Sequence, residues 1–597
     1  MMSLLGSGRP QAAPHTRVAV VRPGRLATAG VTFITLTAAL LLLWTTAAQA
    51  SVWVVPAANR AFPTTKAGSR QYVKIDAAGN EYQGVQVCLR GGGDHTATFT
   101  WGEGSDPLIV DNAKLHRVYY VTVKTPTTAL GSRRGPYPDP LVPRDFGAAV
   151  KVPGSTTPFY ILVHVPYGTP GGTYTATLRV ENGAQTVDVP FSLRVWDFGW
   201  EELSTSTAFA VSKSSIQRSL DGRLNLSGEA KQRVLTAFYD MMRQHGISPT
   251  AVHYLPTVSS SGHAGVRDWS AKVAPFLDED GVDIADTQLP WTLWFPWSRS
   301  KNPSATTRLN YLTDMCRAYK ENGWHKKAYV YILDETTKTS EERRAERYAR
   351  LAHKASARSG YRIRFLLTDD PRPTNLGGVK TKNTFLYDDV DIWALRYYYF
   401  FGRVPAVRER KRAGKEIWWY AYTNRAVRTT PSFVIDKRHI DSRSWGWLME
   451  QWNVDGLLNW GFNRWGKATT GRGWRDPYRN PLSVVKGRTR SNGHTTLVYP
   501  GYYPRYGLTD PYAPPVSSLR LEALRDGLEE REYLRLAKAR GSEGRDLAKA
   551  MLRSVTTFPY KIRQANVFTF PKYTRSDSVF QRARLRLAEF IEADQAP

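Results

Sequence analysis

The sequence contains little cysteine, since only Cys88 and Cys316 occur among its 597 residues. No CxxC or HExxH pattern is present and the histidines are scattered, which disfavours a structural zinc site or a zinc protease. One disulfide is possible, but we expect the two cysteines to lie in different domains and to remain unpaired thiols. We therefore expect neither a bound metal nor a cofactor.

Long apolar runs are missing after residue 50, so no later segment has the length of a membrane-spanning helix. Residues 1–50 themselves resemble an export signal, with four arginines, an apolar stretch from Val31 to Trp44 and a small-residue exit at Ala48-Gln49-Ala50. Cleavage fits this short stretch better than a retained anchor, although both remain open. We predict a secreted or cell-surface protein that begins near Ser51 and has no stable membrane insertion.

Acidic residues are scarce beside basic ones, with 53 Asp and Glu against 82 Lys and Arg and a net charge of +29. The four arginines of the first 50 residues account for four of these charges, which leaves +25 on the mature chain. Such a field attracts polyanions, and outside a cell these include acidic glycans. A merely well-solvated surface is an equally good explanation. The diffuse charge and the expected export argue against a nucleic-acid partner.

The chain length predicts several domains. Residues 51–200 consist of short alternating segments separated by turns, which predicts an all-β sandwich in an accessory role. Residues 201–515 alternate strand-like and helical segments, which predicts an α/β domain closed into a (β/α)8 TIM-type barrel. An open doubly wound sheet is the rival, but no nucleotide-binding glycine loop follows a strand. Residues 516–597 predict a helical extension, whose Arg and Glu side chains we expect to face solvent.

Eight strand-like and five helical segments make up the predicted barrel. The strands are expected at Thr207–Val211, Thr250–Leu255, Ile284–Leu293, Ala328–Leu333, Arg362–Leu367, Val390–Leu395, Glu416–Ala421 and Asp455–Trp460. The helices are expected at Gly228–His245, Thr306–Asn322, Ser340–Ser359, Val404–Ala413 and Ile440–Trp452.

Two acids, Asp334 and Glu335, directly follow the apolar strand Ala328–Leu333. Barrel enzymes build their sites at the carboxyl ends of the strands, so we predict these acids to be catalytic. Neighbouring side chains on a regular strand point to opposite faces, but the backbone leaves the pleat at a strand end and both can face one pocket. Acids at helix starts are also common for reasons of helix stability, so the pair alone is weak evidence.

Aromatic residues follow several of the predicted strands. Flat aromatic side chains with a few polar groups suit the apolar C–H faces of a sugar. Any single tryptophan can instead pack in the core. The predicted substrate-binding residues are Trp393, Trp419, Tyr420, Asn459, Trp460, Arg472 and Arg475.

Several phrases occur in the order found in one enzyme family. They are Gly171-Gly-Thr-Tyr-Thr-Ala-Thr-Leu, the pair Asp334-Glu335, Trp418-Trp419-Tyr420, Asp455-Gly-Leu-Leu-Asn-Trp460, Tyr499-Pro-Gly501 and Ser518-Leu-Arg-Leu-Glu-Ala-Leu-Arg-Asp-Gly-Leu-Glu529. As an ordered set they resemble glycoside hydrolase family 123 and the broader DUF4091 group, over roughly residues 52 to 540. Relatives usually carry proline after the acid pair, where this chain has Thr336, which suggests a diverged loop.

The resemblance implies a retaining β-N-acetylhexosaminidase, similar to β-N-acetylgalactosaminidases, that uses substrate-assisted catalysis. It implies that Asp334 orients the 2-acetamido group of the sugar while that group attacks the anomeric carbon. It further implies that Glu335 protonates the leaving oxygen and then activates water. For this role we expect a raised pKa at Glu335, favoured by the adjacent Asp334 charge and an apolar wall.

The segment after the last predicted strand, Phe462 to Asn492, carries many basic residues and one acid, Asp476. We expect it to overhang the active face. Its arginines would suit a sulfated, phosphorylated or uronic-acid-bearing glycan, and a solvated loop is the alternative.

The sequence leaves two other functions open. A glycosidase for a sugar without an acetamido group would need a second carboxylate, for which Asp369, Asp370 and Asp391 are candidates. An inactive carbohydrate-binding surface protein could also retain the barrel.

Overall fold

A computed structural model describes residues 51–183, 185–292, 295–297, 302–336, 338–371, 386, 388–421, 430–470, 472–557 and 572–594. The expected export signal, residues 1–50, lies outside the described residues. Residues from Gln49 to Pro597 belong to one compact unit. Over the described ranges, no helix combines the length and apolar character needed to cross a membrane.

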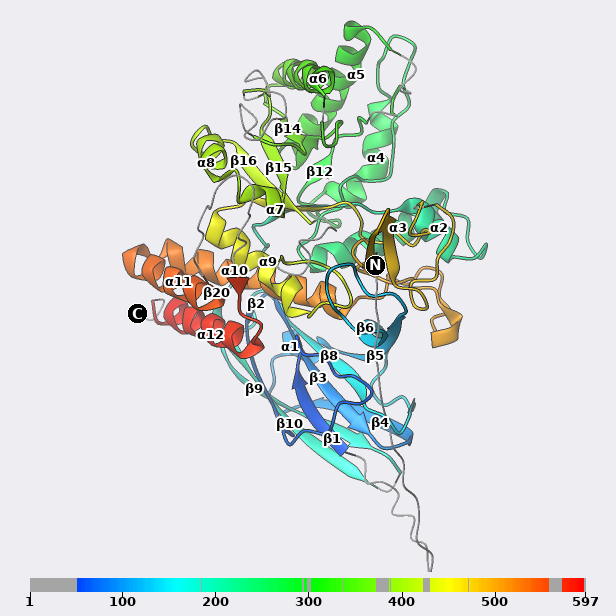
Figure 1. The fold of residues 1–597 in the computed structure, drawn as a ribbon, viewed down its shortest axis with the longest axis vertical. Helices are drawn as coiled ribbons and strands as arrows, with labels where there is room; N and C mark the ends of the chain where they lie inside the picture. The colour runs from blue at the N-terminus through cyan, green and yellow to red at the C-terminus, as the bar shows by residue number, and fades with distance from the viewer. Residues whose placement is uncertain are drawn as a thin grey trace, which may run out of the picture. The chain divides into compact units, whose positions relative to one another are not determined.

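The N-terminal region is a sandwich of two five-stranded sheets (Figure 1). Its elements are β1 Ser51–Pro56, β2 Val73–Gly79, β3 Glu81–Arg90, β4 Gly93–Trp101, α1 Pro107–Val110, β5 Ala113–Val123, β6 Gly135–Arg144, β7 Val150–Val152, β8 Thr157–Val165, β9 Gly172–Glu181 and β10 Thr186–Gly199. One sheet has the order β1-β3-β8-β5-β6 and the other β2-β10-β9-β4-β7. Inward side chains such as Ile161 of the first sheet and Leu193 of the second share one apolar core. The predicted strand-rich N-terminal region is therefore present.

The second region contains a parallel sheet of seven strands. They are β11 Ser206–Phe209, β12 Thr287–Gln288, β13 Ala328–Val330, β14 Arg364–Leu367, β15 Ile392–Arg396, β16 Glu416–Tyr420 and β17 Gly456–Asn459. The order around the sheet is β11-β17-β16-β15-β14-β13-β12, and every neighbouring pair is parallel. This is the order of a barrel rather than of a doubly wound sheet.

The predicted strand Thr250–Leu255 is wrong, so the barrel is nearly closed and is not a complete (β/α)8 barrel. At its place Pro249 forms only an isolated bridge with Phe209. Thr250 N–H donates to the Phe209 carbonyl at 2.9 Å, and the Thr250 carbonyl accepts from Gln288 N–H at 2.7 Å. Proline has no N–H to give to a ladder, and the hydrogen bonds of Thr250 bridge the gap that a strand would fill.

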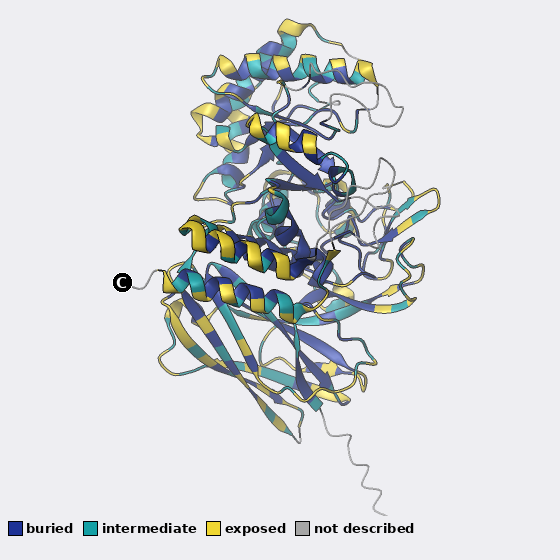
Figure 2. Cartoon of the chain, turned by 60° about the vertical axis from the view of Figure 1, so that its left-hand side comes forward, coloured by how far each residue is buried: buried dark blue, intermediate teal, exposed yellow. Residues whose placement is uncertain are grey.

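Helices cover the outer side of the sheet (Figure 2). The helices and 3-10 turns here are α2 Lys213–Ser219, α3 Gly228–Gln244, α4 Val266–Leu277, α5 Ala305–Glu321, η1 Trp324–Lys326, α6 Thr339–Ala357, α7 Tyr397–Phe400, α8 Val404–Arg412, α9 Ile440–Trp452 and η4 Pro504–Tyr506. The five predicted helices are each found within two residues of their expected ends, whereas α2, α4 and α7 were not predicted. Figure 2 shows exposed residues on the outer faces of the helices and buried residues in the strands between them.

The C-terminal region consists mainly of three helices. Its elements are α10 Leu519–Ala539, α11 Gly541–Val555, β20 Thr556–Thr557, β21 Lys572–Tyr573 and α12 Asp577–Ala593. Figure 1 shows α10 between the sandwich and the parallel sheet. Helix α10 packs on α9 so closely that a Cβ on Gly527 would lie 2.0 Å from the Arg443 carbonyl oxygen.

The expectation that the charged residues of α10 face solvent is wrong. Arg520 is fully buried and binds both oxygens of Asp139 in the sandwich, each at 2.8 Å. Glu522 lies 3.0 Å from His245 of the barrel region, and Glu529 accepts from Tyr82 N–H at 3.1 Å. Because buried charges need partners, these residues bind the flanking regions to α10. The segment from Ser518 to Glu529 therefore holds the sandwich and the barrel region to α10.

Both cysteines are buried and unpaired, as predicted. Cys88 lies on β3 and Cys316 on α5, in different regions of the chain. Burial raises the pKa of each thiol to about 12, so neither is a reactive thiolate at neutral pH.

Candidate active site

The two predicted catalytic acids lie just beyond β13, at the carboxyl end of the parallel sheet. Asp334 forms a parallel bridge with Thr368, which follows β14. Glu335 has a φ of 47°, in the left-handed region that non-glycine residues rarely adopt. Such strain is typical of functional sites, and here it turns the chain out of the pleat. Consecutive carboxylates can therefore both reach the mouth of the barrel.

Asp334 is exposed and is held through one of its two oxygens. Tyr331 Oη donates to Asp334 Oδ1 at 2.9 Å, and Thr368 Oγ1 donates to the same oxygen at 2.7 Å. Burial and the Asp334 charge hold the pKa of Tyr331 well above its usual range, so its hydroxyl stays a neutral donor. Among the described residues nothing bonds to Asp334 Oδ2. The two bonds to Oδ1 fix the orientation of the carboxylate.

Glu335 is held by a fork of donors from β15 and β16. Tyr420 Oη donates to Glu335 Oε1 at 2.7 Å, and Arg396 Nε donates to the same oxygen at 2.9 Å. Arg396 Nη2 bonds to Glu335 Oε2, which completes a bidentate ion pair. Arg396 also donates from Nε to Tyr420 Oη at 3.0 Å and from Nη1 to Tyr398 Oη at 3.1 Å.

This geometry reverses the expected pKa shift of Glu335. Burial raises the pKa of this carboxyl, but the hydrogen bonds from Arg396 and Tyr420 and the positive charges of Arg396 and Lys486 outweigh it, and the pKa falls below 4.5. The prediction of a raised pKa is therefore wrong for the free protein. The pKa of Glu335 is lowered because the Arg396 guanidinium binds the ionised form of the carboxyl.

The alternative carboxylates have other partners. Asp391 precedes β15 and so lies at the opposite end of the strands, where His353 Nε2 is 2.7 Å and Arg362 Nη2 3.0 Å from its oxygens. It cannot be a second catalytic carboxylate at the same mouth. Asp370 pairs with Arg403 at 2.8 Å.

Thr336 is buried, and its hydroxyl donates to Asp369 Oδ2. The residue that follows the acid pair thus binds the third candidate carboxylate. A proline could not form this bond, because it has no side-chain donor.

Of the predicted substrate-binding residues, Tyr420 is in the site and the two neighbouring tryptophans are not. Trp393 and Trp419 are 1% and 0% exposed and belong to the core between the sheet and its helices. Side chains alternate along a strand, so Trp419 points outward where Tyr420 points inward. The prediction that Trp393 and Trp419 line the cleft is corrected accordingly.

The residues after β17 have different environments. Asn459 is fully buried and donates to the Gly461 carbonyl at 2.8 Å, so it shapes the turn after β17. Trp460 is partly exposed, and its Nε1 donates to His494 Nε2 at 3.2 Å. The Arg464 guanidinium lies 4.7 Å from the centre of the Trp460 ring. Trp460 therefore remains a candidate contact for a sugar.

The two predicted arginines also differ from each other. Arg475 is 6% exposed and donates to the carbonyls of Gly466 and Arg464, each at 3.0 Å. It holds the loop together and is not free to bind a substrate. Arg472 is exposed, as a ligand contact requires.

Three residues of the site, Tyr331, Thr368 and Arg396, were not predicted from the sequence. Each stands two residues beyond a side chain of the barrel interior, namely Tyr329, Leu366 and Ala394. Side chains two residues apart on a strand point to the same face. Extending this alternation past the ends of the strands would have identified the three residues.

Comparison with known proteins supports one family. The family model described as "Glycoside hydrolase 123, catalytic domain" matches residues 233–537, which is about half of the chain. A family 123 glycoside hydrolase from Clostridium perfringens has a similar fold, with a TM-score of 0.64 over 91% of this chain and 97% of that chain at 13% identity.

Other solved structures are much less similar. A β-glucuronidase from Parabacteroides merdae reaches a TM-score of 0.28 at 10% identity, covering 76% of this chain and 50% of that one. A β-D-glucuronidase from Dictyoglomus thermophilum reaches 0.30 at 9% identity, covering 80% and 68%. No curated protein sequence matches the chain.

Proposed function

The chain belongs to glycoside hydrolase family 123, since the match to that catalytic domain spans residues 233–537, and on this basis we propose that it is a retaining β-N-acetylhexosaminidase with substrate-assisted catalysis. The observation that carries the proposal is the pair of consecutive acids at one strand end. Conventional retaining enzymes place two carboxyls on either side of the scissile bond. Asp334 and Glu335 approach from one side, so the nucleophile is supplied by the substrate.

Asp334 positions the acetamido group of the sugar. Its Oδ1 is fixed by Tyr331 and Thr368, while Oδ2 accepts from the acetamido N–H. As the acetamido oxygen attacks the anomeric carbon, positive charge develops on the acetamido nitrogen and carbon. A fixed carboxylate next to them stabilises that charge.

Glu335 acts as acid and then as base. In the first step the bond between the acetamido oxygen and the anomeric carbon forms, the glycosidic bond breaks, and the Glu335 proton passes to the leaving oxygen. In the second step water attacks the anomeric carbon and its proton returns to Glu335, while the acetamido group is restored. The sum is one water added across the glycosidic bond, with retention.

The first step needs protonated Glu335, whereas Arg396 holds the free protein's carboxylate ionised. Substrate binding must therefore loosen the pair between Arg396 and Glu335. Burial alone raises the pKa of Glu335. A site closed by the sugar would then favour the protonated acid.

The test is a panel of aryl β-glycosides of N-acetylgalactosamine, N-acetylglucosamine, galactose and arabinose, with Glu335→Gln as control. The two N-acetyl sugars should be hydrolysed and the other two should not. Turnover of galactosides or arabinosides alone would indicate a conventional mechanism, and no turnover at all would indicate a binding protein.

The pattern of residues 1–50 supports the further proposal that the chain is exported and cleaved before Ser51. Sequencing the N-terminus of protein secreted by an expressing cell should begin at Ser51. Recovery only in the cell fraction would contradict it.

A further inference from the structure

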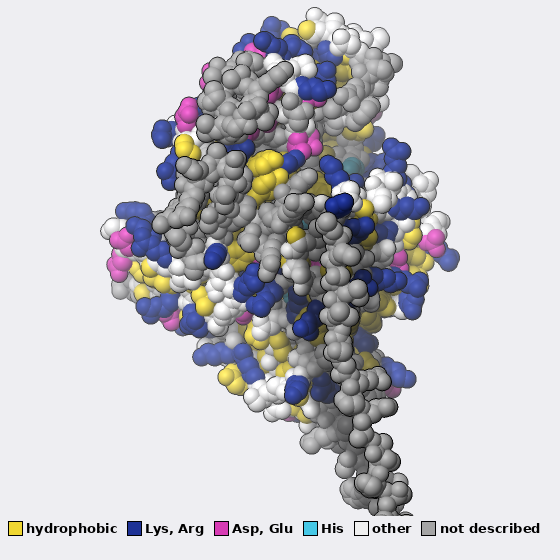
Figure 3. Space-filling view, in the orientation of Figure 1, with side chains coloured by type: hydrophobic (Ala, Val, Ile, Leu, Met, Phe, Trp, Pro, Cys, Tyr) yellow, Lys and Arg dark blue, Asp and Glu magenta, His cyan; other side chains and the backbone are white. Residues whose placement is uncertain are grey.

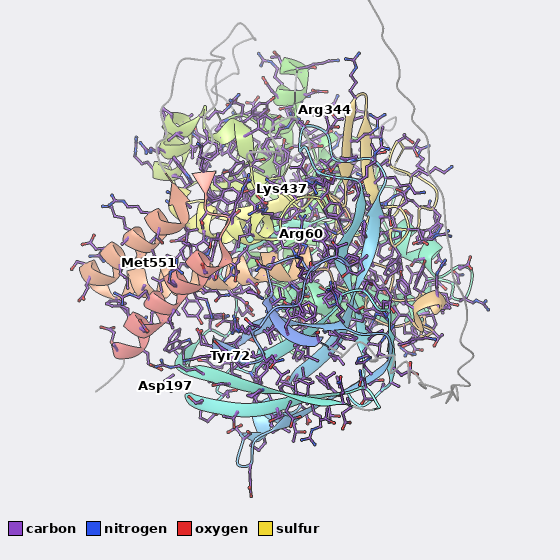
Figure 4. All side chains as sticks on the ribbon, turned by 60° about the horizontal axis from the view of Figure 1, so that its bottom comes forward. Arg60, Tyr72, Asp197, Arg344, Lys437 and Met551 are labelled. Atoms are coloured by element: carbon purple, nitrogen blue, oxygen red, sulfur yellow. The ribbon has the colours of Figure 1, made fainter. Side chains whose placement is uncertain are left out.

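Two basic segments from different regions of the chain lie together beside the site. One is the hairpin of β18 Leu482–Lys486 and β19 Thr489–Asn492, and the other is the sandwich loop 124–134 between β5 and β6. Thr128 N–H donates to the Arg490 carbonyl at 2.9 Å, and Arg490 N–H donates to Thr128 Oγ1 at 2.8 Å. The gold hairpin lies beside the blue strands of the sandwich in Figure 1 and in Figure 4.

A buried carboxylate fixes this junction. Asp436 accepts from Thr127 N–H and from Thr127 Oγ1, each at 2.6 Å, and from Ser132 Oγ at 2.6 Å. Asn492 Nδ2 also donates to Asp436 at 3.3 Å. The two segments are therefore held in one arrangement before any ligand binds, which lowers the entropy cost of binding.

The surface of this junction carries six exposed cations and no exposed acid. Neither segment contains Asp or Glu, and Asp436 is buried. Within the described ranges none of the six forms an ion pair. Figure 3 shows Lys and Arg side chains spread over much of the visible surface, with fewer Asp and Glu among them. The six are Lys124, Arg133, Arg134, Lys486, Arg488 and Arg490.

The hairpin is joined to the carboxyl end of the parallel sheet, because His494, two residues beyond β19, accepts from Nε1 of Trp460, which directly follows β17, at 3.2 Å. Lys486 ends β18, and its positive charge contributes to the lowered pKa of Glu335. The ammonium group is thus within electrostatic range of the site at the end of β13.

We propose that these two segments form one binding surface for an anionic glycan, a substrate with sulfate or uronate groups on the sugars next to the hydrolysed residue. This inference rests on the proposed function. The basic surface can bind other sugars of the substrate only if the site at Glu335 hydrolyses a glycan. Guanidinium forks match sulfate and carboxylate groups. A single exposed ion pair contributes little, but six cations arranged over one surface act together. The sandwich is thereby part of substrate recognition.

The test measures binding of full-length mature protein to chondroitin sulfate, to neutral dextran of similar length and to single-stranded DNA. One variant neutralises the hairpin (Lys486→Gln, Arg488→Gln and Arg490→Gln). A second neutralises the sandwich loop (Lys124→Gln, Arg133→Gln and Arg134→Gln). A matched control removes three exposed charges of α11 (Arg545→Gln, Lys549→Gln and Arg553→Gln).

Each of the first two variants should bind chondroitin sulfate about tenfold more weakly at low salt and show a shallower salt dependence, while the α11 control should stay near wild type. Equal weakening in all three would overturn the proposal, since the diffuse net charge would then suffice. DNA bound as tightly as chondroitin sulfate, and lost in the same variants, would also overturn it. Turnover of aryl glycosides by the wild type is measured in a separate assay. That assay tests the proposed function, whereas the binding measurements test the proposed surface, so the two can fail independently.

Discussion

Replacing Arg396 with Gln should allow Glu335 to hold its proton at higher pH. In the structure the Arg396 guanidinium binds both Glu335 oxygens, and Tyr420 adds a third bond. Glutamine keeps a single neutral donor and removes the charge. In the variant, burial still raises the pKa of Glu335, while the hydrogen bonds and the charge of Arg396 no longer lower it.

The magnitude follows from the bonds that are lost. A hydrogen bond to a charged group contributes about 1.5–3 kcal/mol. The Glu335 side chain is 36% exposed and that of Arg396 17%, so solvent screening places the stability loss near the lower end, about 1–2 kcal/mol for the pair. Because the folded pKa of Glu335 is lowered, this stability is present above its ordinary value of 4.5 and is lost as the pH falls through the folded value. The variant should thus be less stable at pH 7 and approach wild type in acid.

The assay is the pH profile of kcat/KM on an aryl β-N-acetylhexosaminide with a poor leaving group. The alkaline limb of the Arg396→Gln profile should move to higher pH, and Tyr420→Phe should move it less in the same direction. Thermal unfolding at pH 7 and pH 4 provides the stability comparison. An alkaline limb that stays in place or moves to lower pH would refute the assignment of Arg396 as the residue that keeps Glu335 ionised.

Three further variants test other parts of the structure. Glu335→Gln should abolish hydrolysis of poor leaving groups with the fold intact by circular dichroism, and unchanged turnover would remove Glu335 from the mechanism. Asp139→Asn breaks the buried pair with Arg520 and should lower the unfolding free energy by about 3–5 kcal/mol in denaturant titrations; a loss under 1 kcal/mol would show that the pair is dispensable. Burial raises the pKa of Asp526 to about 7, so its stability contribution is present below 3.8 and lost as the pH rises through 7. Asp526→Asn should therefore raise the melting temperature more at pH 9 than at pH 5, and an equal gain at both would contradict that pKa.

Features set by local patterns were predictable from the sequence. Helix α3 was expected at Gly228–His245 and occurs at Gly228–Gln244, because the helical spacing of its buried apolar residues, such as Leu235, Phe238 and Met242, is a property of the segment itself. The position of Asp334 and Glu335 was also predictable, since a strand followed by acids needs only the strand-end rule. The strand expected at Thr250–Leu255 is not formed, because the proline directly before it, Pro249, and the tight closure of the barrel outweighed local propensity.

Features set by contacts between distant residues were not predictable. Glu335 and Arg396 are 61 positions apart, and their pair reverses a pKa that the neighbouring residues alone suggested. The leucines of α10 indicated one buried face, but the helix is enclosed on several sides and its charged residues are paired with partners from the sandwich and the barrel. The spacing of apolar residues along a helix does not show which distant residues will pair with its charged side chains.

The central claim is that the substrate's own acetamido group is the nucleophile and that Asp334 supports it. A thiazoline analogue of the cyclised intermediate tests this most directly, through inhibition constants for the wild type and for Asp334→Asn. We predict strong inhibition of the wild type, weaker binding of the thiazoline to the variant, and a loss of about 3–4 kcal/mol in transition-state stabilisation on N-acetylhexosaminides. Hydrolysis of a sugar without an acetamido group, together with no inhibition by the thiazoline, would contradict it.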